Sequence, residues 1–306
     1  MYLSHFGLRE FPFGITPDTE FFFLSAESQA ALNTLLVAVK TGEGFIKIIG
    51  EVGTGKTILC RKLMKSLEQE FKIAYIPNPF LGPLGFFQEL ADELQVSIEP
   101  AHASSQQHIL RALNQRLLEM NQRGERALIC LDEAQAMPIE TLEALRLLTN
   151  LETEKRKLVQ VVIFGQPELE DKLNAPSIRQ LKQRIAFEHR LQPMAPADVD
   201  YYIHHRLLVA GHHGAALFTK PALWLLKRKS HCVPRLLNIL SHKAMLAAFG
   251  EGEKQVKFRH VSAAAKDTAS VQKRISSQWG LKLALVFLAT FVMTYAIAFI
   301  WHETSL

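Results

Sequence analysis

Residues 44–57 have the sequence GFIKIIGEVGTGKT, in which a short apolar run leads directly into a glycine-rich segment. From residue 50 onward the segment fits G-x-x-x-x-G-K-[ST], the pattern of a phosphate-binding P-loop. Glycines let backbone N–H groups turn onto an anion, the lysine reaches the β- and γ-phosphates, and the final hydroxyl meets Mg²⁺. The helix that follows directs its positive end at the phosphates. The predicted nucleotide-binding residues are Gly50, Glu51, Val52, Gly53, Thr54, Gly55, Lys56 and Thr57.

A second sign of nucleotide chemistry lies at the end of the apolar run 127–131, where Asp132 and Glu133 follow. A run that is apolar throughout is typical of a strand covered on both faces in a parallel sheet. A carboxylate at the end of such a strand, beside a P-loop, can hold Mg²⁺, and a neighbouring glutamate can polarise the attacking water. We therefore predict Asp132 and Thr57 as the Mg²⁺ residues and Glu133 as the catalytic one. The sequence contains no N/T-K-x-D guanine motif, which favours ATP over GTP.

Further strand-like runs at residues 72–76, 159–164 and 185–191 alternate with helical patterns, so the sequence predicts an α/β fold with a parallel sheet. Gln166 follows the run 159–164 and would lie at the same edge of the sheet as Asp132, where it could sense the γ-phosphate. Arg184 belongs to a basic cluster, and we predict that it contacts the γ-phosphate bound to a neighbouring subunit. The alternative for that cluster is a solvated surface.

The first 23 residues form an irregular arm rich in Phe, Pro and Gly. Its rings either cover the edge of the core or, through Phe11 or Phe13, contact the adenine. Beyond residue 195 the pattern is wholly helical, at 199–209, 219–229 and 234–249, which predicts a small helical lid. The three cysteines lack C-x-x-C spacing and are predicted to be buried packing residues.

Residues 283–301 carry no charged side chain and are long enough, as a helix, to span a bilayer of about 30 Å. Basic residues precede this stretch and are nearly absent after it, so the positive-inside rule leaves the preceding chain in the cytoplasm. We expect a single transmembrane helix at 283–301, with residues 263–282 as a juxtamembrane tether and 302–306 as a short periplasmic tail. The alternative is a buried hydrophobic helix of a soluble domain.

The order of several motifs resembles that of the AAA+ ATPases of the ExeA/GspA secretion type, and most closely their MshM-like relatives linked to mannose-sensitive haemagglutinin pilus assembly. The likeness covers about residues 1–250. The matching stretches are FGL at 6–8, PF at 12–13, TPD at 16–18, GEVGTGKT at 50–57, LDEAQ at 131–135, FGQPEL at 164–169, QR at 183–184 and VPRLLN at 233–238.

By this resemblance, Asn78 would be the switch residue that restrains Glu133, Gln166 the first sensor, and Arg235 the second sensor, which reaches from the lid to the nucleotide. The resemblance also implies a five-stranded parallel sheet, catalysis between subunits of a ring, and an inner-membrane location. The module would then comprise an N-terminal arm and helix at 1–43, a P-loop core at 44–194 and a lid at 195–262. Cys232 stands where relatives usually carry Gly, so the turn into the lid would differ.

We therefore expect a membrane-anchored ATPase that assists assembly or positioning of a pilus or type II secretion-like complex. Its partners would be copies of itself and inner-membrane assembly proteins. Relatives of this type continue into a periplasmic peptidoglycan-binding domain, so here a separate partner would bind the cell wall. One alternative is a helper ATPase for DNA transactions such as transposition or replication initiation. The net charge of +5 would suit phosphates, but no basic stripe interleaved with aromatics is present. A nucleotide switch that scarcely hydrolyses is disfavoured by Glu133.

Overall fold

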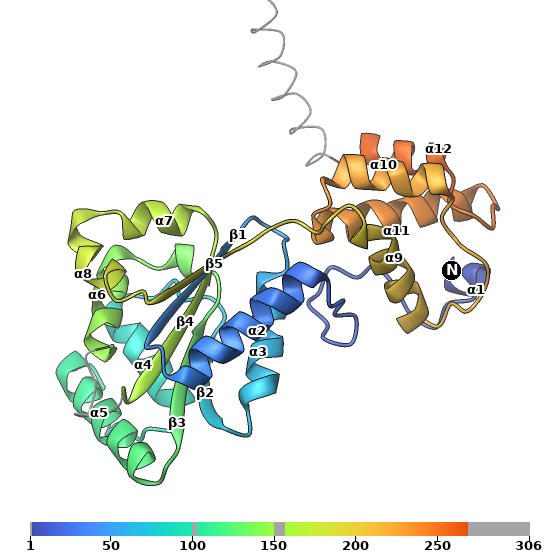
Figure 1. The fold of residues 1–306 in the computed structure, drawn as a ribbon. Coiled ribbons are helices and arrows are strands. Elements are labelled where there is room, and N and C mark those ends of the chain that lie inside the picture. Colours follow the sequence, from blue (N-terminus) through green and yellow to red (C-terminus); the bar gives the residue numbers. More distant parts are fainter. Residues whose placement is uncertain (1, 100–102, 150–156, 269–306) are drawn as a thin grey trace, which may run out of the picture.

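The computed structural model describes residues 2–99, 103–149 and 157–268, which form an α/β core and a helical lid (Figure 1). The core is built on five parallel strands in the order β2-β3-β4-β1-β5. The prediction of a five-stranded parallel sheet is thus confirmed, with strand ends within about two residues of the predicted ones. The strands are β1 (Phe45–Gly50), β2 (Phe71–Ile76), β3 (Arg126–Leu131), β4 (Val159–Gly165) and β5 (Phe187–Leu191).

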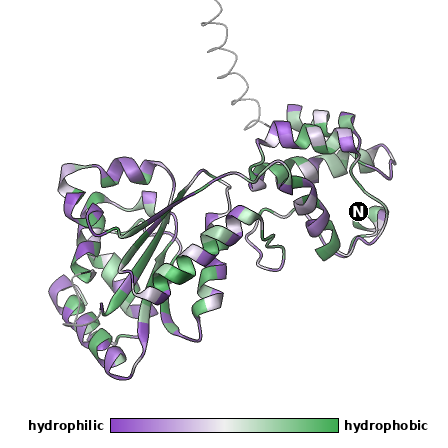
Figure 2. Cartoon of the chain, in the orientation of Figure 1, coloured by the Kyte–Doolittle hydropathy of each residue, from purple (hydrophilic) through white to green (hydrophobic). Residues whose placement is uncertain are grey.

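Burial along the central strands explains why apolar runs in the sequence predict their positions. Every residue of β1 and β4 is buried, because helices cover both faces of the sheet there. The edge strand β5 alternates between exposed and less exposed residues. Figure 2 shows the same contrast, with the central strands coloured hydrophobic and the helices mixed.

Two groups of helices cover the sheet. One face packs against α2 (Ala26–Thr41) and α3 (Lys56–Leu67), with Cys60 and Cys130 buried between α3 and β3. The other face carries a larger hydrophobic cluster with the remaining core helices. These are α4 (Pro83–Glu93), α5 (Gln106–Gln122), α6 (Ile139–Leu148), α7 (Glu168–Leu173) and α8 (Arg179–Lys182), with short 3₁₀ turns η2 (Ala134–Ala136) and η3 (Pro176–Ile178).

The lid has its own hydrophobic core, and the N-terminal arm is part of it. Helix α1 (Tyr2–Phe6) and the arm side chains Leu8, Phe13 and Phe21 are buried among the lid helices. In Figure 1 the N-terminus accordingly lies beside the lid and away from the sheet. The lid helices are α9 (Asp198–Val209), α10 (Lys220–Ser230), α11 (Pro234–Gly250) and α12 (Phe258–Lys266).

Helix α12 differs from the prediction, because it crosses the expected lid boundary at residue 262. Its side chains Val261, Ala264 and Ala265 are buried in the lid cluster, and Thr268 bonds back to the carbonyl of Ala264 at 2.7 Å. The helical body therefore extends into the segment predicted as a tether. Among the described residues no helix is long and apolar enough to cross a membrane. The predicted span at 283–301 lies outside them.

Candidate functional site

The P-loop joins β1 to α3 at the carboxyl edge of the sheet. Gly53 and Gly55 adopt left-handed backbone angles, with φ of 83° and 106°, which L side chains rarely adopt. Helix α3 begins at Lys56, immediately after the loop, so its unpaired N–H groups face the space that the loop encloses. This is the geometry that an anion such as a phosphate requires.

Lys56 is only 5% exposed and folds back onto the loop. Its Nζ donates hydrogen bonds to the carbonyls of Gly50 at 2.8 Å and Glu51 at 3.1 Å. Burial lowers the pKa of Lys56, and nearby carboxylates, led by Glu133 and Asp132, oppose this by favouring its charge. Its ammonium is thus held at the loop by weak acceptors that a phosphate can replace.

Asp132 is 2% exposed at the tip of β3. Burial raises the pKa of this carboxyl, whereas hydrogen bonds from the Thr57 hydroxyl and the Glu133 backbone N–H, the latter at 2.9 Å, act in the opposite direction. A buried carboxylate close to a hydroxyl of the P-loop offers the hard oxygen ligands that Mg²⁺ takes. The predicted Mg²⁺ residues Asp132 and Thr57 are therefore in contact, and their chemistry suits the ion.

Glu133 lines the pocket and has a left-handed backbone, with φ of 51°. Its Oε2 accepts hydrogen bonds from two amides, Gln166 Nε2 at 3.0 Å and Gln135 Nε2. Asn78 is exposed after β2 and has no hydrogen bond to Glu133 in the described structure. The role of Asn78 as a switch stays a prediction, and the groups that hold Glu133 here are Gln135 and Gln166.

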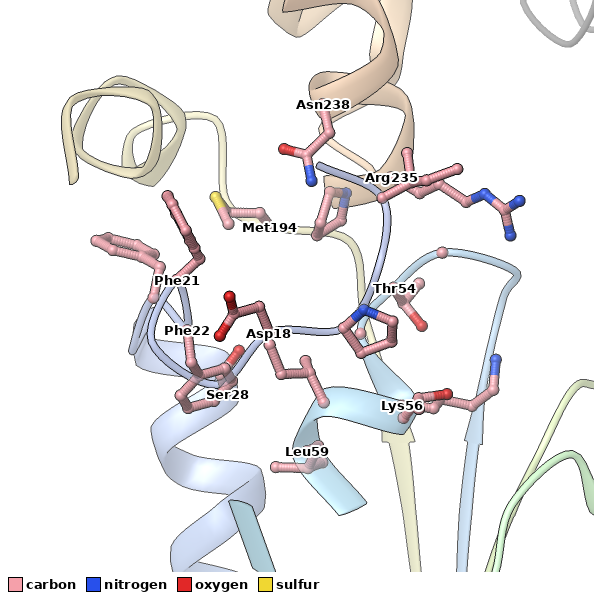
Figure 3. Close-up of a pocket in the computed structure, with 18 of the residues that line it drawn as sticks. Asp18, Phe21, Phe22, Ser28, Thr54, Lys56, Leu59, Met194, Arg235 and Asn238 are labelled. Carbon is pink, nitrogen blue, oxygen red and sulfur yellow. The ribbon is translucent and has the colours of Figure 1, made fainter. Parts of the chain in front are cut away.

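One pocket extends from the P-loop to the arm and the lid (Figure 3). Phe11 and Phe13, for which adenine contact was one of two alternatives, are not among the residues of the described chain that line it. Phe13 is buried against Phe218, and Phe11 packs on Tyr2. The arm instead contributes a later segment, which includes Asp18, Phe21, Phe22 and Phe23. Of the two alternatives for Phe11 and Phe13, the structure favours packing over contact with the adenine, and the sequence left both open because an irregular arm has no period that shows which side chains face inward.

The lid closes the pocket through the start of α11. The backbone N–H of Arg235 donates to the Gly53 carbonyl at 3.2 Å, and Arg235 and Pro234 line the pocket. A Cβ on Gly53 would lie 2.5 Å from the Arg235 Cβ, so the approach depends on the glycine. In Figure 3 the side chains of Arg235 and Lys56 extend to the same side of the pocket, away from Phe21 and Phe22.

A buried polar network that the sequence did not reveal holds the arm against the lid. Arg206 is 7% exposed and donates to the carbonyl of Pro12 at 2.6 Å and to the hydroxyl of Tyr202 at 3.0 Å. Tyr202 donates in turn to Asn238 Oδ1 at 2.7 Å, and Asn238 Nδ2 donates to the Gly14 carbonyl at 3.2 Å. Nothing in the local pattern of α9 or α11 distinguishes these side chains from ordinary helix residues.

Arg184 lies apart from this pocket, because no lining residue comes from its segment between α8 and β5 in the described chain. Its Nη1 donates to the carbonyl of Thr149 at 2.8 Å and to the Thr149 hydroxyl at 3.3 Å. Thr149 caps the C-terminus of α6, where a cation also meets the negative end of the helix dipole. Within its own subunit, Arg184 thus makes a structural contact with the end of α6.

Residues 39–173, which include the P-loop, the β3 tip and Gln166, match the family model described as an AAA domain. Over 285 residues, or 93% of the chain, the sequence is 39% identical to general secretion pathway protein A of Aeromonas hydrophila. The chain covers 52% of that relative, which is about half its length. The chain is therefore similar in sequence to general secretion pathway protein A, and its parallel sheet with a P-loop is the α/β fold that an AAA domain has.

Solved structures agree on the fold. Cdc6p from Pyrobaculum aerophilum superposes with a TM-score of 0.61 at 19% identity, covering 78% of this chain and 68% of that one. The Aeropyrum pernix ORC1 protein in complex with DNA gives 0.58 at 20% identity, covering 83% and 68%. The Thermotoga maritima RuvB branch migration motor gives 0.55 at 14% identity, covering 84% and 73%. At these identities the likeness concerns the fold alone.

Proposed function

We propose that this chain binds ATP with Mg²⁺ and hydrolyses it. The observation that carries the proposal is the convergence of Lys56, Thr57, Glu133 and Arg235 on one pocket, with the buried carboxyl of Asp132 next to Glu133 in the chain. These side chains come from the P-loop, the β3 tip and the lid. Their combination supplies a phosphate-binding cation, a metal site and a base.

Each group has a task that its surroundings support. Lys56 exchanges its two backbone carbonyls for phosphate oxygens, and Thr57 and Asp132 would hold Mg²⁺, which supplies charge neutralisation at the phosphates. Glu133 takes the proton from the attacking water as a general base. Gln166, already beside Glu133, would contact the γ-phosphate with the second hydrogen of its amide group.

The test separates binding from chemistry. The Lys56→Ala variant should lose ATP binding, measured by calorimetry with Mg²⁺, whereas Glu133→Gln should bind ATP normally and lose turnover. Lys65→Ala is the matched control, since Lys65 is an exposed lysine of the same helix. Equal turnover in Glu133→Gln and wild type would refute the role of Glu133, and wild type without any ATP binding would refute the proposal.

We infer further that the ATPase is anchored in the inner membrane and assists assembly of a secretion or pilus complex. The relation to general secretion pathway protein A and the uncharged stretch 283–301 support this. A chain shortened at residue 277 should leave the membrane fraction, and extraction of the full chain without detergent would contradict the anchor. Affinity capture with the ATP-locked Glu133→Gln form should recover inner-membrane assembly proteins. Salt-dependent binding to duplex DNA would instead favour the DNA-transaction alternative.

The proposed unit is a ring in which Arg184 serves a neighbouring subunit. Its distance from its own pocket fits a role in trans, although it must then exchange its bond to Thr149. Mixing Arg184→Ala with Lys56→Ala protein should restore part of the ATPase activity, because each variant supplies what the other lacks. If both variants are folded and their mixture is inactive, this would argue against the role of Arg184 at the neighbouring subunit.

A further inference from the structure

Gln135 occupies an unusual position between two residues of the proposed catalytic site. It lies in the 3₁₀ turn η2, two residues after Glu133, and is half-buried. Its Nε2 donates to Glu133 Oε2, and its Oε1 accepts the backbone N–H of Gln166 at 3.0 Å. Both ends of one amide are therefore used, one toward the base and one toward the end of β4.

Gln166 also contacts Glu133 directly, because its Nε2 donates to Glu133 Oε2 at 3.0 Å. Two amide donors thus meet the same carboxylate oxygen, while Oε1 of Glu133 accepts no hydrogen bond from the described part of the chain. Because Glu133 lines the pocket, this free oxygen is the one available to a water molecule there. The amides fix the carboxylate without occupying the oxygen that would act.

The turn itself explains why the glutamate needs such support. Glu133 has a φ of 51°, a backbone angle that non-glycine residues adopt at a cost of about 1 to 2 kcal/mol. The strained angle turns the chain from β3 into η2 and brings Gln135 back toward the glutamate. Glu133 precedes a turn of only three residues and not a long helix. Its side chain therefore depends on its hydrogen bonds to keep a single orientation.

We propose that Gln135 is a positioning residue for ATP hydrolysis, which joins the end of β4 to the carboxylate of Glu133 and keeps that base in its working orientation. The inference rests on the proposed ATPase function. It assigns Gln135 no contact with ATP. A residue that only filled space at this position would not require an amide, since an apolar side chain of the same length would pack equally well.

The test replaces Gln135 by methionine, which keeps the length of the side chain and removes both hydrogen bonds. Gln88→Met is the matched control, because Gln88 is also half-buried and donates through its amide to the Ala103 carbonyl, outside the proposed site. General base catalysis contributes about 100- to 10,000-fold, so a misoriented base should lower kcat by about 10- to 100-fold. KM for ATP should stay within about 2-fold in both variants, since neither amide is placed on the nucleotide.

A second readout distinguishes positioning from folding. In a Glu133→Gln background, single-turnover cleavage of labelled ATP should be the same with and without Gln135→Met, because the base that Gln135 orients is already absent. Gln135→Glu, which keeps the shape and the acceptor for Gln166 but lacks the donor, should lower kcat as Gln135→Met does. The inference about Gln135 would be overturned if Gln135→Met slowed cleavage further in the Glu133→Gln background, or if Gln135→Met alone left kcat unchanged. In either case, turnover by wild type would still support the proposed ATPase function. Wild type that binds ATP without cleaving it would overturn both.

Discussion

Replacing Arg206 by methionine should release the N-terminal arm from the lid. Arg206 is 7% exposed, and its guanidinium lies over the ring of Phe21 at 4.8 Å. It donates to the Pro12 carbonyl at 2.6 Å, to the Tyr202 hydroxyl at 3.0 Å and, more weakly, to the Gly14 carbonyl at 3.4 Å. Methionine retains the apolar stem of the arginine and removes these donors. The Gly14 carbonyl keeps a partner in Asn238, whereas the buried Pro12 carbonyl is left without its donor.

The cost follows from the two shorter bonds. A hydrogen bond from a charged donor contributes about 1.5 to 3 kcal/mol, and an orphaned buried carbonyl adds a desolvation penalty. Removing the guanidinium also removes the cost of burying its charge, which offsets part of the loss. We therefore expect the free energy of unfolding to fall by about 2 to 4 kcal/mol. The affinity for ATP should fall as well, because the released arm carries Asp18 and Phe22 of the pocket wall.

Urea unfolding followed by circular dichroism measures the first effect, and limited proteolysis within residues 9–23 reports release of the arm directly. Arg259→Met is the control, since Arg259 is exposed and its ion pairs with Glu251 and Glu253 lie on the surface. That variant should unfold at nearly the same urea concentration as wild type. If Arg206→Met also matched wild type in unfolding and in proteolysis of the arm, the network would have no part in holding the arm.

Burial raises the pKa of Asp132, so its carboxyl stabilises the fold at low pH and this contribution is lost as pH rises through the raised pKa. Asp132→Asn should therefore raise the melting temperature of the nucleotide-free protein at pH 7 in EDTA by about 2 to 4 °C. A lower melting temperature would contradict the reasoning. The same variant should lose Mg²⁺-dependent ATP binding. In wild type, acidification should weaken Mg²⁺-dependent ATP binding, with a midpoint at a higher pH than the ordinary pKa of an aspartate. A midpoint at the ordinary pKa of an aspartate would contradict a raised pKa for Asp132. Gly53→Ala places a Cβ 2.5 Å from Arg235 at a φ of 83°, so ATP affinity should fall about 10-fold or more, the equivalent of about 1.4 kcal/mol. Gly82→Ala, where a Cβ meets nothing within 4 Å, should bind ATP as wild type does, and equal affinities in the two alanine variants would contradict the lid contact.

The sheet was predictable because its central strands are short apolar runs that are buried almost throughout. The run 159–164 became β4 (Val159–Gly165), in which no residue is exposed. The predicted fifth strand began two residues early, at 185, because that edge strand is polar and alternating, so its sequence gives a weaker boundary. The phosphate end of the site was predictable for another reason. Its residue types are fixed by chemistry at fixed spacing, and the parallel sheet brings the ends of β1 and β3 to one edge.

Tertiary contacts decided what the sequence did not show. Phe11 and Phe13 have the same chemistry as Phe21 and Phe22, and only the packing of the arm on the lid decides which rings face the pocket. Helix α12 was missed because its apolar residues, such as Val261, are few and small, and its burial depends on α10 and α11. The amide orientation of Gln135 likewise depends on the left-handed turn before it, which a local pattern does not encode.

The arm joins the pocket to the lid, and this has a thermodynamic consequence. Its early residues are in the lid core, whereas Asp18 and Phe22 line the pocket on the side away from Lys56 (Figure 3). A nucleotide that fills the pocket contacts the P-loop, the arm and the start of α11 together, so its binding free energy includes the free energy of holding the lid in this position. Linkage is reciprocal, so the factor by which the closed lid raises ATP affinity is also the factor by which bound ATP favours the closed lid. ATP should therefore protect the arm from proteolysis in wild type, and at the same ATP concentration that protection should be weaker in Arg206→Met, because its affinity for ATP falls.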